Sequence, residues 1–371
     1  MKSLLLSVVV FFFILQPVTH AAQAIPGHLP AELTPQFVSI GFDDNYLVEG
    51  VTWVIDTLKP LRNPPGTGNK ATFDGTPVRV TLFNNTDNGH PARPDNDLGR
   101  IYVKAAASGN EIGVHTRHHT TSEATLLSGW RQEIGGCKQD LVALPLSPAS
   151  IIGFRAPFLL TNKAAFNTLR TLRFAYDSSI EHGLDDRSDG TDLRWPYPLD
   201  NGSPDAPKIG SQPGLWEMPV YYLSVPPRLR AGVQAKWKEF DISSGKITGL
   251  DWNMVAGFVE GGAGFNKEEY LETLKYSLDQ RLRGNRAPLL IGAHSQFYTA
   301  QAMGMDFNPP NITYQEMRQV IEQFIAYALS KPEVRIVPYR NILAWCQHPS
   351  PLNNPVHAAR FGSSSRELSR Q

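Results

Sequence analysis

Two short polar segments, each following an apolar run, contain residues suited to metal chemistry. Asp43 and Asp44 end one run, and His115 and His119 follow another. Successive side chains of an extended chain alternate in direction, so one carboxylate can bind a metal while the other faces a substrate. His115 and His119 are four residues apart and would share one face of a helical turn. Two histidines and one carboxylate, with coordination positions left open, are typical of a catalytic zinc rather than a structural one.

The elements that must position these residues follow an alternating α/β pattern. A chain of 371 residues is long for one domain but lies within the range of a single α/β barrel with insertions. Short apolar runs predict eight strands, and the carboxyl ends of barrel strands meet on one face, where catalysis occurs. The predicted strands are 37–42, 78–83, 112–114, 151–154, 174–176, 215–219, 289–293 and 335–337.

Helical periodicity separates several of these strands. It is clearest in 124–141, 163–172, 267–283 and 314–329. Asn162 and Thr313 stand where N-caps are expected. The fold class that we predict is therefore α/β, a distorted (β/α) barrel.

The two ends of the chain differ in composition from its middle. Lys2 precedes an apolar run, and small residues between Ala21 and Ala24 suit signal-peptidase cleavage, so we expect a secretory signal peptide over 1–24. A membrane anchor is the alternative, but the run is shorter than the ~20 residues of a spanning helix. The catalytic domain is then 25–348, and the Pro- and Ser-rich end, 349–371, predicts a disordered tail.

Within the domain, residues 181–264 are rich in Gly, Pro, Asp and Trp and lack a sustained helical period. We interpret them as a large insertion between barrel elements, and long insertions in compact domains are usually functional. The formal net charge is zero, so electrostatics gives no case for a nucleic-acid partner. Cys137 and Cys346 allow one disulfide in an oxidising compartment, but two separate buried thiols are equally compatible with the sequence.

Five ordered segments together resemble a known family. They are Asp43-Asp44, His115 to His119, Arg155-Ala156-Pro157-Phe158, Asp177-Ser178-Ser179 and Ala293-His294-Ser295. Their order and content resemble the polysaccharide deacetylases, carbohydrate esterase family four, and the resemblance spans most of the chain. Segments such as 155–159, 195–197, 215–219 and 285–289 make the chain most similar to the animal-type chitin deacetylases.

The resemblance implies a role for each of these residues in deacetylation. Asp44, His115 and His119 would hold a divalent metal, for which zinc is the expected ion. Asp43 would be the general base that takes a proton from the attacking water. Arg155 would pair with Asp43 and keep that carboxylate ionised.

The same resemblance assigns the acid and the oxyanion donor. His294 would protonate the leaving nitrogen, and Asp177 would hold the other ring nitrogen of His294 and raise its pKa. The backbone N–H of Phe158 would help to stabilise the oxyanion. Structural alternatives remain for three residues. Arg155 can form a structural ion pair, Asp177 can stabilise a turn, and His118 can compete with His119 as a metal ligand.

Three positions depart from the common family pattern. Asn45 follows the paired aspartates where glycine is frequent, but asparagine also tolerates left-handed backbone angles. Phe158 stands where tyrosine is usual, which loses a hydroxyl and keeps the backbone donor. Ser178 follows Asp177 where many members carry an aromatic that walls the acetyl pocket.

The substrate is expected to be an acetylated polysaccharide or oligosaccharide. Sugars stack on aromatic side chains, and Trp195, Tyr197 and Trp237 of the insertion are our candidate sugar-binding residues. Polymers of N-acetylglucosamine, chitin above all, fit best, whereas peptidoglycan and acetylated xylan stay open. Other readings are a catalytically weak carbohydrate-binding protein on the same fold and a hydrolase of small amides. We expect a secreted or periplasmic monomer with no stable membrane anchor.

Overall fold

The computed structural model describes residues 24–120, 127–183, 188–257, 261–303 and 307–352. Within these residues the chain builds a nine-stranded sheet with the order β11-β1-β2-β3-β4-β5-β8-β7, and β12 also pairs with β1. All pairs are parallel except β7 with β8. The strands are β1 (Gln36–Asp44), β2 (Thr81–Asn84), β3 (Glu111–Val114), β4 (Gly153–Phe154), β5 (Tyr176–Asp177), β7 (Tyr197–Pro198), β8 (Trp216–Glu217), β11 (Leu289–His294) and β12 (Val334–Ile336).

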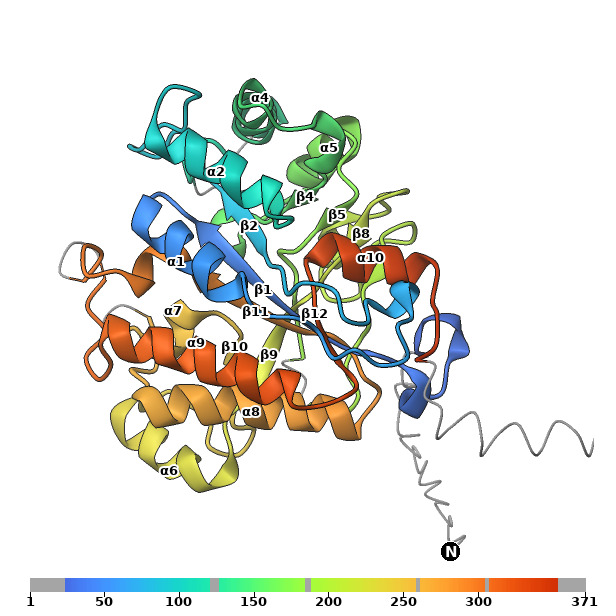
Figure 1. Cartoon of the computed structure of the whole chain (residues 1–371), viewed down its shortest axis with the longest axis vertical. Helices are drawn as coiled ribbons and strands as arrows, with labels where there is room; N and C mark the ends of the chain where they lie inside the picture. Colours follow the sequence, from blue (N-terminus) through green and yellow to red (C-terminus); the bar gives the residue numbers. More distant parts are fainter. Residues whose placement is uncertain (1–23, 121–126, 184–187, 258–260, 304–306, 353–371) are drawn as a thin grey trace, which may run out of the picture.

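The sheet curls into a half-barrel, and a second sheet lies beside its β11 edge (Figure 1). This three-stranded sheet contains β6 (Glu181–His182), β9 (Val220–Ser224) and β10 (Lys246–Thr248). A parallel bridge between Leu250 and Gly292 joins the segment after β10 to β11. The arrangement is the α/β barrel type predicted from the sequence, although the main sheet follows an open path from β11 to β7.

Helices surround the outside of the curled sheet (Figure 1). Helices α8 and α9 pack against each other, and α1 contacts α2. The helices are α1 (Val48–Leu58), α2 (Asp97–Ala107), α3 (Leu127–Trp130), α4 (Gly136–Ala143), α5 (Lys163–Thr171), α6 (Pro227–Lys236), α7 (Asp251–Val255), α8 (Lys267–Arg283), α9 (Tyr314–Leu329) and α10 (Tyr339–Gln347), with a π-helical turn, Arg131–Gly135, between α3 and α4.

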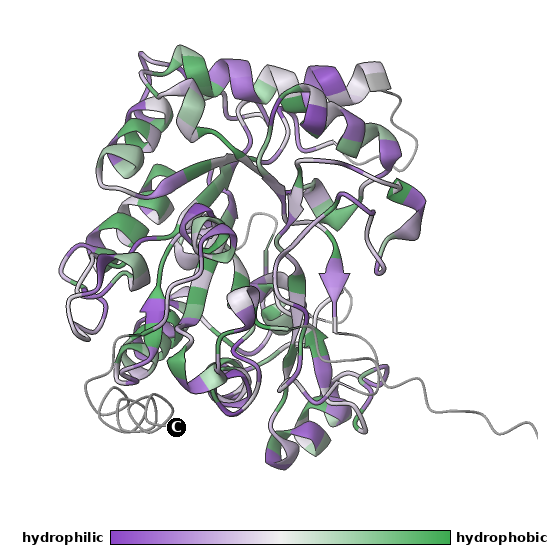
Figure 2. Ribbon diagram, turned by 90° about the vertical axis from the view of Figure 1, so that its right-hand side faces the viewer, coloured by the Kyte–Doolittle hydropathy of each residue, from purple (hydrophilic) through white to green (hydrophobic). Residues whose placement is uncertain are grey.

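Strand β1 shows how the sequence sorts residues between the two faces of the sheet. Val38, Ile40 and Phe42 belong to the core shared with the outer helices, whereas Phe37 packs with the aromatic residues inside the half-barrel. This alternation is the period of an extended chain. Figure 2 shows the hydrophobic residues concentrated on the central strands and the polar ones on the periphery. By this alternation, Asp43 is the last residue of β1 on the face that also carries Phe37.

The eight strands predicted from apolar runs are all present, as β1 to β5, β8, β11 and β12. The predicted caps are also confirmed: the side chains of Asn162 and Thr313 accept N–H groups of the first turns of α5 and α9. The strands β6, β7, β9 and β10 lie in the region 181–264 and were not predicted. This region supplies β7 and β8 to the main sheet as well as the small sheet.

The predictions for the two chain ends and for the cysteines have separate outcomes. The predicted signal peptide lies outside the described residues except for Ala24. Residues 349–352 at the start of the predicted tail make contacts, including a hydrogen bond from Leu352 N–H to Leu33 O, and the rest of the tail lies outside the described part. Cys137 and Cys346 are free and buried. Over the described ranges, no helix combines the length and apolar character that crossing a membrane requires.

Candidate active site

The carboxyl end of β1 places two carboxylates in different surroundings. Asp43 is 2% exposed and faces Arg155 inside the half-barrel. The next two residues, Asp44 and Asn45, have φ of +65° and +59°, in the left-handed region that is uncommon outside glycine. The Asn45 side-chain amide donates to the carbonyls of Phe42 and Phe83, at 2.8 and 3.0 Å, which fixes this turn.

Asp44, His115 and His119 converge on one point. The Asp44 Oδ1 atom lies 3.6 Å from His115 Nε2 and 3.3 Å from His119 Nε2, and one ligand atom of each residue falls within 4.8 Å of the others. Oδ1 is buried yet has no hydrogen-bond donor among the described residues. A buried carboxylate oxygen needs a partner, and a cation between two imidazoles would supply it. The three residues therefore fit a divalent metal.

The two histidines are brought together by a loop and not by a helical turn. Thr116 and His119 have φ of +67° and +55°, which folds the segment after β3 back on itself. The His115 Nδ1 atom lies 2.8 Å from the carbonyl oxygen of Arg155 and donates to it, which leaves Nε2 with a lone pair toward Asp44. Burial lowers the pKa of His115 to about 3, so its imidazole is neutral, as a metal ligand must be.

His118 lies outside this cluster. Its Nδ1 is 2.8 Å from Glu133 Oε1, and its side chain is about half exposed. Of the two histidines, His119 and not His118 is therefore positioned to bind a metal together with Asp44 and His115. His118 instead closes the loop against the helical segment that contains Glu133.

The Arg155 side chain holds Asp43 in place. Its Nη1 donates to both Asp43 oxygens, at 3.0 and 3.3 Å, and Nη2 donates to the Tyr339 hydroxyl at 2.7 Å. Gly41 makes room for the guanidinium, because a Cβ there would lie 3.1 Å from Arg155 Nη1. Burial raises the pKa of Asp43 above its ordinary value, and the Arg155 charge opposes this rise.

His294, the last residue of β11, pairs with a carboxylate that the sequence analysis missed. Its Nδ1 lies 2.6 Å from Asp251 Oδ1, and its backbone N–H donates to Asp251 Oδ2 at 2.9 Å. Burial acts to lower the pKa of His294, but the Asp251 carboxylate outweighs it and raises the pKa to about 9. The predicted Asp177–His294 hydrogen bond is wrong: the Asp177 carboxylate accepts from the backbone N–H and hydroxyl of Ser179.

The physical reason for this correction lies in the strand order. Asp177 sits on β5, and three strands separate it from β1 and four from β11. Asp251 opens α7 directly after the bridge between Leu250 and Gly292, beside the end of β11. The local signal was an acidic residue at the end of a short apolar run, but β10 itself was not recognised.

Phe158 contributes its backbone as well as its ring. Its φ is +53°, and its ring is 62% exposed at the mouth of the site, with its centroid 4.8 Å from that of His119. Its N–H makes no hydrogen bond within the part of the chain that the structure describes. A donor left open at a cavity wall is suited to a developing oxyanion.

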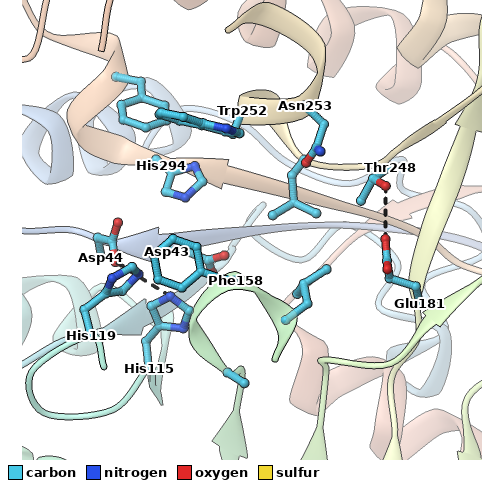
Figure 3. Close-up of a pocket in the computed structure, with 14 residues that line it drawn as sticks. Asp43, Asp44, His115, His119, Phe158, Glu181, Thr248, Trp252, Asn253 and His294 are labelled. Atoms are coloured by element: carbon cyan, nitrogen blue, oxygen red, sulfur yellow. Dashed lines mark hydrogen bonds and ion pairs between the residues drawn. The ribbon is translucent and has the colours of Figure 1, made fainter. Parts of the chain in front are cut away.

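These side chains surround one cavity of about 550 Å³. Figure 3 shows the metal-ligand cluster at one end, His294 and Trp252 along one side, and Glu181 with Thr248 at the far end. The lining residues that the sequence analysis did not single out are Leu159, Glu181, Thr248, Leu250, Trp252, Asn253 and Phe297. Several of them belong to the small sheet and α7, so region 181–264 builds one wall.

The three predicted sugar-binding aromatics lie elsewhere. Trp195 and Tyr197 are buried, at 1% and 6% exposure, and bond to Asn285 O and Ser203 Oγ. Trp237 ends α6 and packs against Phe240. None of the three lines the cavity. The region does contribute an aromatic side chain, Trp252, to the cavity. Which rings face the cavity depends on burial, and in irregular segments burial cannot be predicted from periodicity.

Comparisons with known proteins show which proteins the chain is similar to. No protein-family model matches the sequence. The chain is 23% identical over 340 residues to chitin deacetylase 8 of Bombyx mori, covering 89% of this chain and 75% of that protein. It is 26% identical over 168 residues to chitin deacetylase 1 of the same species, covering 42% of this chain and 27% of that protein.

The fold is shared with a solved structure. A Mycobacterium smegmatis protein assigned to the polysaccharide deacetylases superposes with a TM-score of 0.55 at 16% identity, covering 88% of this chain and 94% of that one. The fold, the family motifs in their order and the similarity to the insect protein agree. The chain therefore resembles the polysaccharide deacetylases, carbohydrate esterase family 4, and among them it is similar to the animal chitin deacetylases.

Proposed function

We propose that this protein is a secreted, metal-dependent deacetylase that hydrolyses N-acetyl groups of an N-acetylglucosamine-containing polysaccharide or oligosaccharide, with chitin as the preferred substrate. One observation carries the proposal. The Asp44, His115 and His119 cluster shares a single cavity with an arginine-held carboxylate, Asp43, and a carboxylate-held imidazole, His294.

These groups match what amide hydrolysis requires. A divalent metal bound by Asp44, His115 and His119 would lower the pKa of a water molecule and polarise the acetyl carbonyl. Zinc suits this mixed imidazole and carboxylate set with open positions.

The chain's own residues handle the protons. Asp43, aimed by Arg155, accepts the proton of the attacking water, and its raised pKa favours proton uptake. The Phe158 N–H donates to the oxygen that becomes negative. His294, kept protonated by Asp251, donates the proton that the amine needs in order to leave.

The cavity walls support a sugar substrate. Trp252 and Phe297 supply apolar surface, and Glu181, Thr248 and Asn253 supply hydrogen-bonding groups. Sugar rings bury an apolar face and keep hydroxyls hydrogen-bonded, so this mixture suits them. Similarity to insect chitin deacetylases favours chitin over peptidoglycan or acetylated xylan. The apolar run within 1–24 supports secretion through a cleaved signal peptide.

A carbohydrate-binding protein that has lost turnover is the alternative on the same fold. Such a protein would be expected to lack a metal ligand or the base. Asp43, Asp44, His115, His119 and His294 are all present around the cavity, which favours an enzyme.

The test is acetate release from chitin oligomers, peptidoglycan and acetylated xylan by the purified protein. We expect release from chitin oligomers, loss of release after chelation, and recovery when zinc is returned. If the protein binds oligomers but releases acetate from none of the substrates, it is a carbohydrate-binding protein and not an enzyme.

A further inference from the structure

Two buried carboxyl groups lie side by side in the main sheet, outside the candidate active site. Asp177 on β5 and Glu217 on β8 are directly opposite each other in parallel register, and both are fully buried. Opposite residues of paired strands present their side chains to the same face. This register brings the two carboxyl groups close enough to interact, and a hydrogen bond between them can form. Carboxylates only accept hydrogen bonds, so such a bond requires that one of the two holds a proton.

The remaining hydrogen bonds indicate which one holds it. Asp177 accepts from the Ser179 N–H at 3.0 Å and from the Ser179 hydroxyl at 2.8 Å. Glu217 Oε1 accepts from the Ile180 N–H at 3.1 Å, whereas its buried Oε2 has no donor among the described residues. A buried, ionised oxygen without a donor would destabilise the fold, whereas a protonated Oε2 can donate a hydrogen bond to Asp177. Burial raises the pKa of Asp177 to about 6 and that of Glu217 well above its ordinary range.

The pair is connected to the candidate base through two serines. The Ser179 hydroxyl, which donates to Asp177, accepts from the Ala156 N–H at 2.8 Å. The Arg155 guanidinium donates to the Ser178 carbonyl oxygen at 3.0 Å and to the Ser178 hydroxyl at 3.2 Å. The turn that follows Asp177 therefore supports both the residue that holds Asp43 and the segment that leads to Phe158.

We propose that Asp177 and Glu217 share one proton and act together as positioning residues, fixing the Ser178-Ser179 turn so that Arg155 and the Phe158 backbone stay aligned in the site. The pair touches neither the metal ligands nor the cavity. Its claimed effect on turnover rests on the function proposed above, whereas the shared proton does not.

Few other charges face the pair. Arg155, directly after β4, faces Asp177, and Tyr197 on β7 and Asp205 in the following loop face Glu217. Asp205 is itself in contact with His182 and Arg194. No cation in the part of the chain that the structure describes forms an ion pair with Glu217.

An infrared measurement tests the proton directly. At neutral pH, ordinary carboxyl groups are ionised, so the carbonyl band of a protonated carboxylic acid reports buried acids. Glu217→Gln should remove such a band, since the amide donates to Asp177 but carries no acid proton. Glu111→Gln is the matched control: Glu111 is buried and bonds to Thr81 and Tyr176, but it is not paired with a carboxyl group of the residues that the structure describes. An identical protonated-acid band in the wild type and Glu217→Gln would overturn the proposal.

The pH dependence of unfolding gives a second readout. Because folding raises the pKa of Glu217, the folded state keeps a proton that the unfolded chain has released above the ordinary glutamate pKa. The stability of the wild type relative to Glu217→Gln should therefore fall as pH rises above that value, until the folded-state pKa is passed. Parallel melting-temperature curves for the two proteins across this range would contradict a shared proton.

Turnover separates positioning from simple folding. Glu217→Gln should keep kcat, whereas Glu217→Leu and Ser179→Ala should lower kcat between about 10- and 100-fold with metal content and KM retained. Equal damage by Glu217→Gln and Glu217→Leu would mean that an ionised Glu217 is required, and the proposal would fail. The infrared and melting experiments need no substrate, so absence of acetate release from the wild type would count against the proposed function alone.

Discussion

The imidazole of His294 and the carboxylate of Asp251 form the shortest charged contact at the candidate site, 2.6 Å between Nδ1 and Oδ1. Asp251 is fully buried and opens α7, and His294 ends β11, so the pair joins the wall supplied by 181–264 to the main sheet. The carboxylate fixes the orientation of the ring and leaves Nε2 directed at the cavity.

The first prediction follows from the pKa of about 9 at His294. A general acid must be protonated, so turnover should be lost as pH rises through that value. Asp251→Asn removes the charge that raises the pKa while burial still lowers it, so the alkaline limb of kcat against pH should move to lower pH. Rate profiles of the two proteins measure the shift, and an unmoved alkaline limb would remove His294 as the acid.

The second prediction concerns the metal. His115→Ala should lose bound metal and turnover together, because it deletes a ligand at the buried carboxylate oxygen. His118→Ala is the matched control, since His118 bonds to Glu133 and lies outside the cluster. Elemental analysis of purified proteins checks both. Full metal content in His115→Ala, or equal loss in the control, would be incompatible with the assigned ligands.

The third prediction concerns the substrate wall. Trp252→Ala should raise KM for chitin oligomers about fivefold, because a lost aromatic contact of ~1 kcal/mol corresponds to roughly that factor. Trp237→Ala should leave KM unchanged, since Trp237 packs on Phe240 away from the cavity. Steady-state kinetics of the two variants decides between them. A larger rise in KM for Trp237→Ala than for Trp252→Ala would instead support Trp237 as a sugar-binding residue, as the sequence predicted.

The sequence was most informative where one local pattern decides the structure. Apolar runs identify the main strands because both faces of the sheet are covered, and β1 is buried along its length from Gln36 to Asp43. The paired carboxylates of Asp43 and Asp44 diverge as alternation predicts, and His119 rather than His118 joins the cluster. These features depend on neighbours in the chain or on the family's motif order.

The parts that were missed depend on long-range packing. Asp251 meets His294 across 43 residues, through a strand too short and polar to recognise. Trp195 is an aromatic in an irregular segment, and only the fold reveals that it packs against Trp345 in the core and not against a ligand. Asp177 and Glu217 are brought together by register between strands of two residues each.

The most direct measurement is acetate release from a chitin oligomer by Asp43→Asn and Asp44→Asn, with metal content determined on the same samples. Asp43 is held by Arg155 and, in the proposed function, would accept the proton of water, so Asp43→Asn should keep its metal and lose turnover by at least about 100-fold. Asp44→Asn should lose both, because its oxygen faces the two imidazoles. Wild-type turnover by Asp43→Asn, or the same metal loss in both variants, would contradict the division between base and ligand on which the account depends.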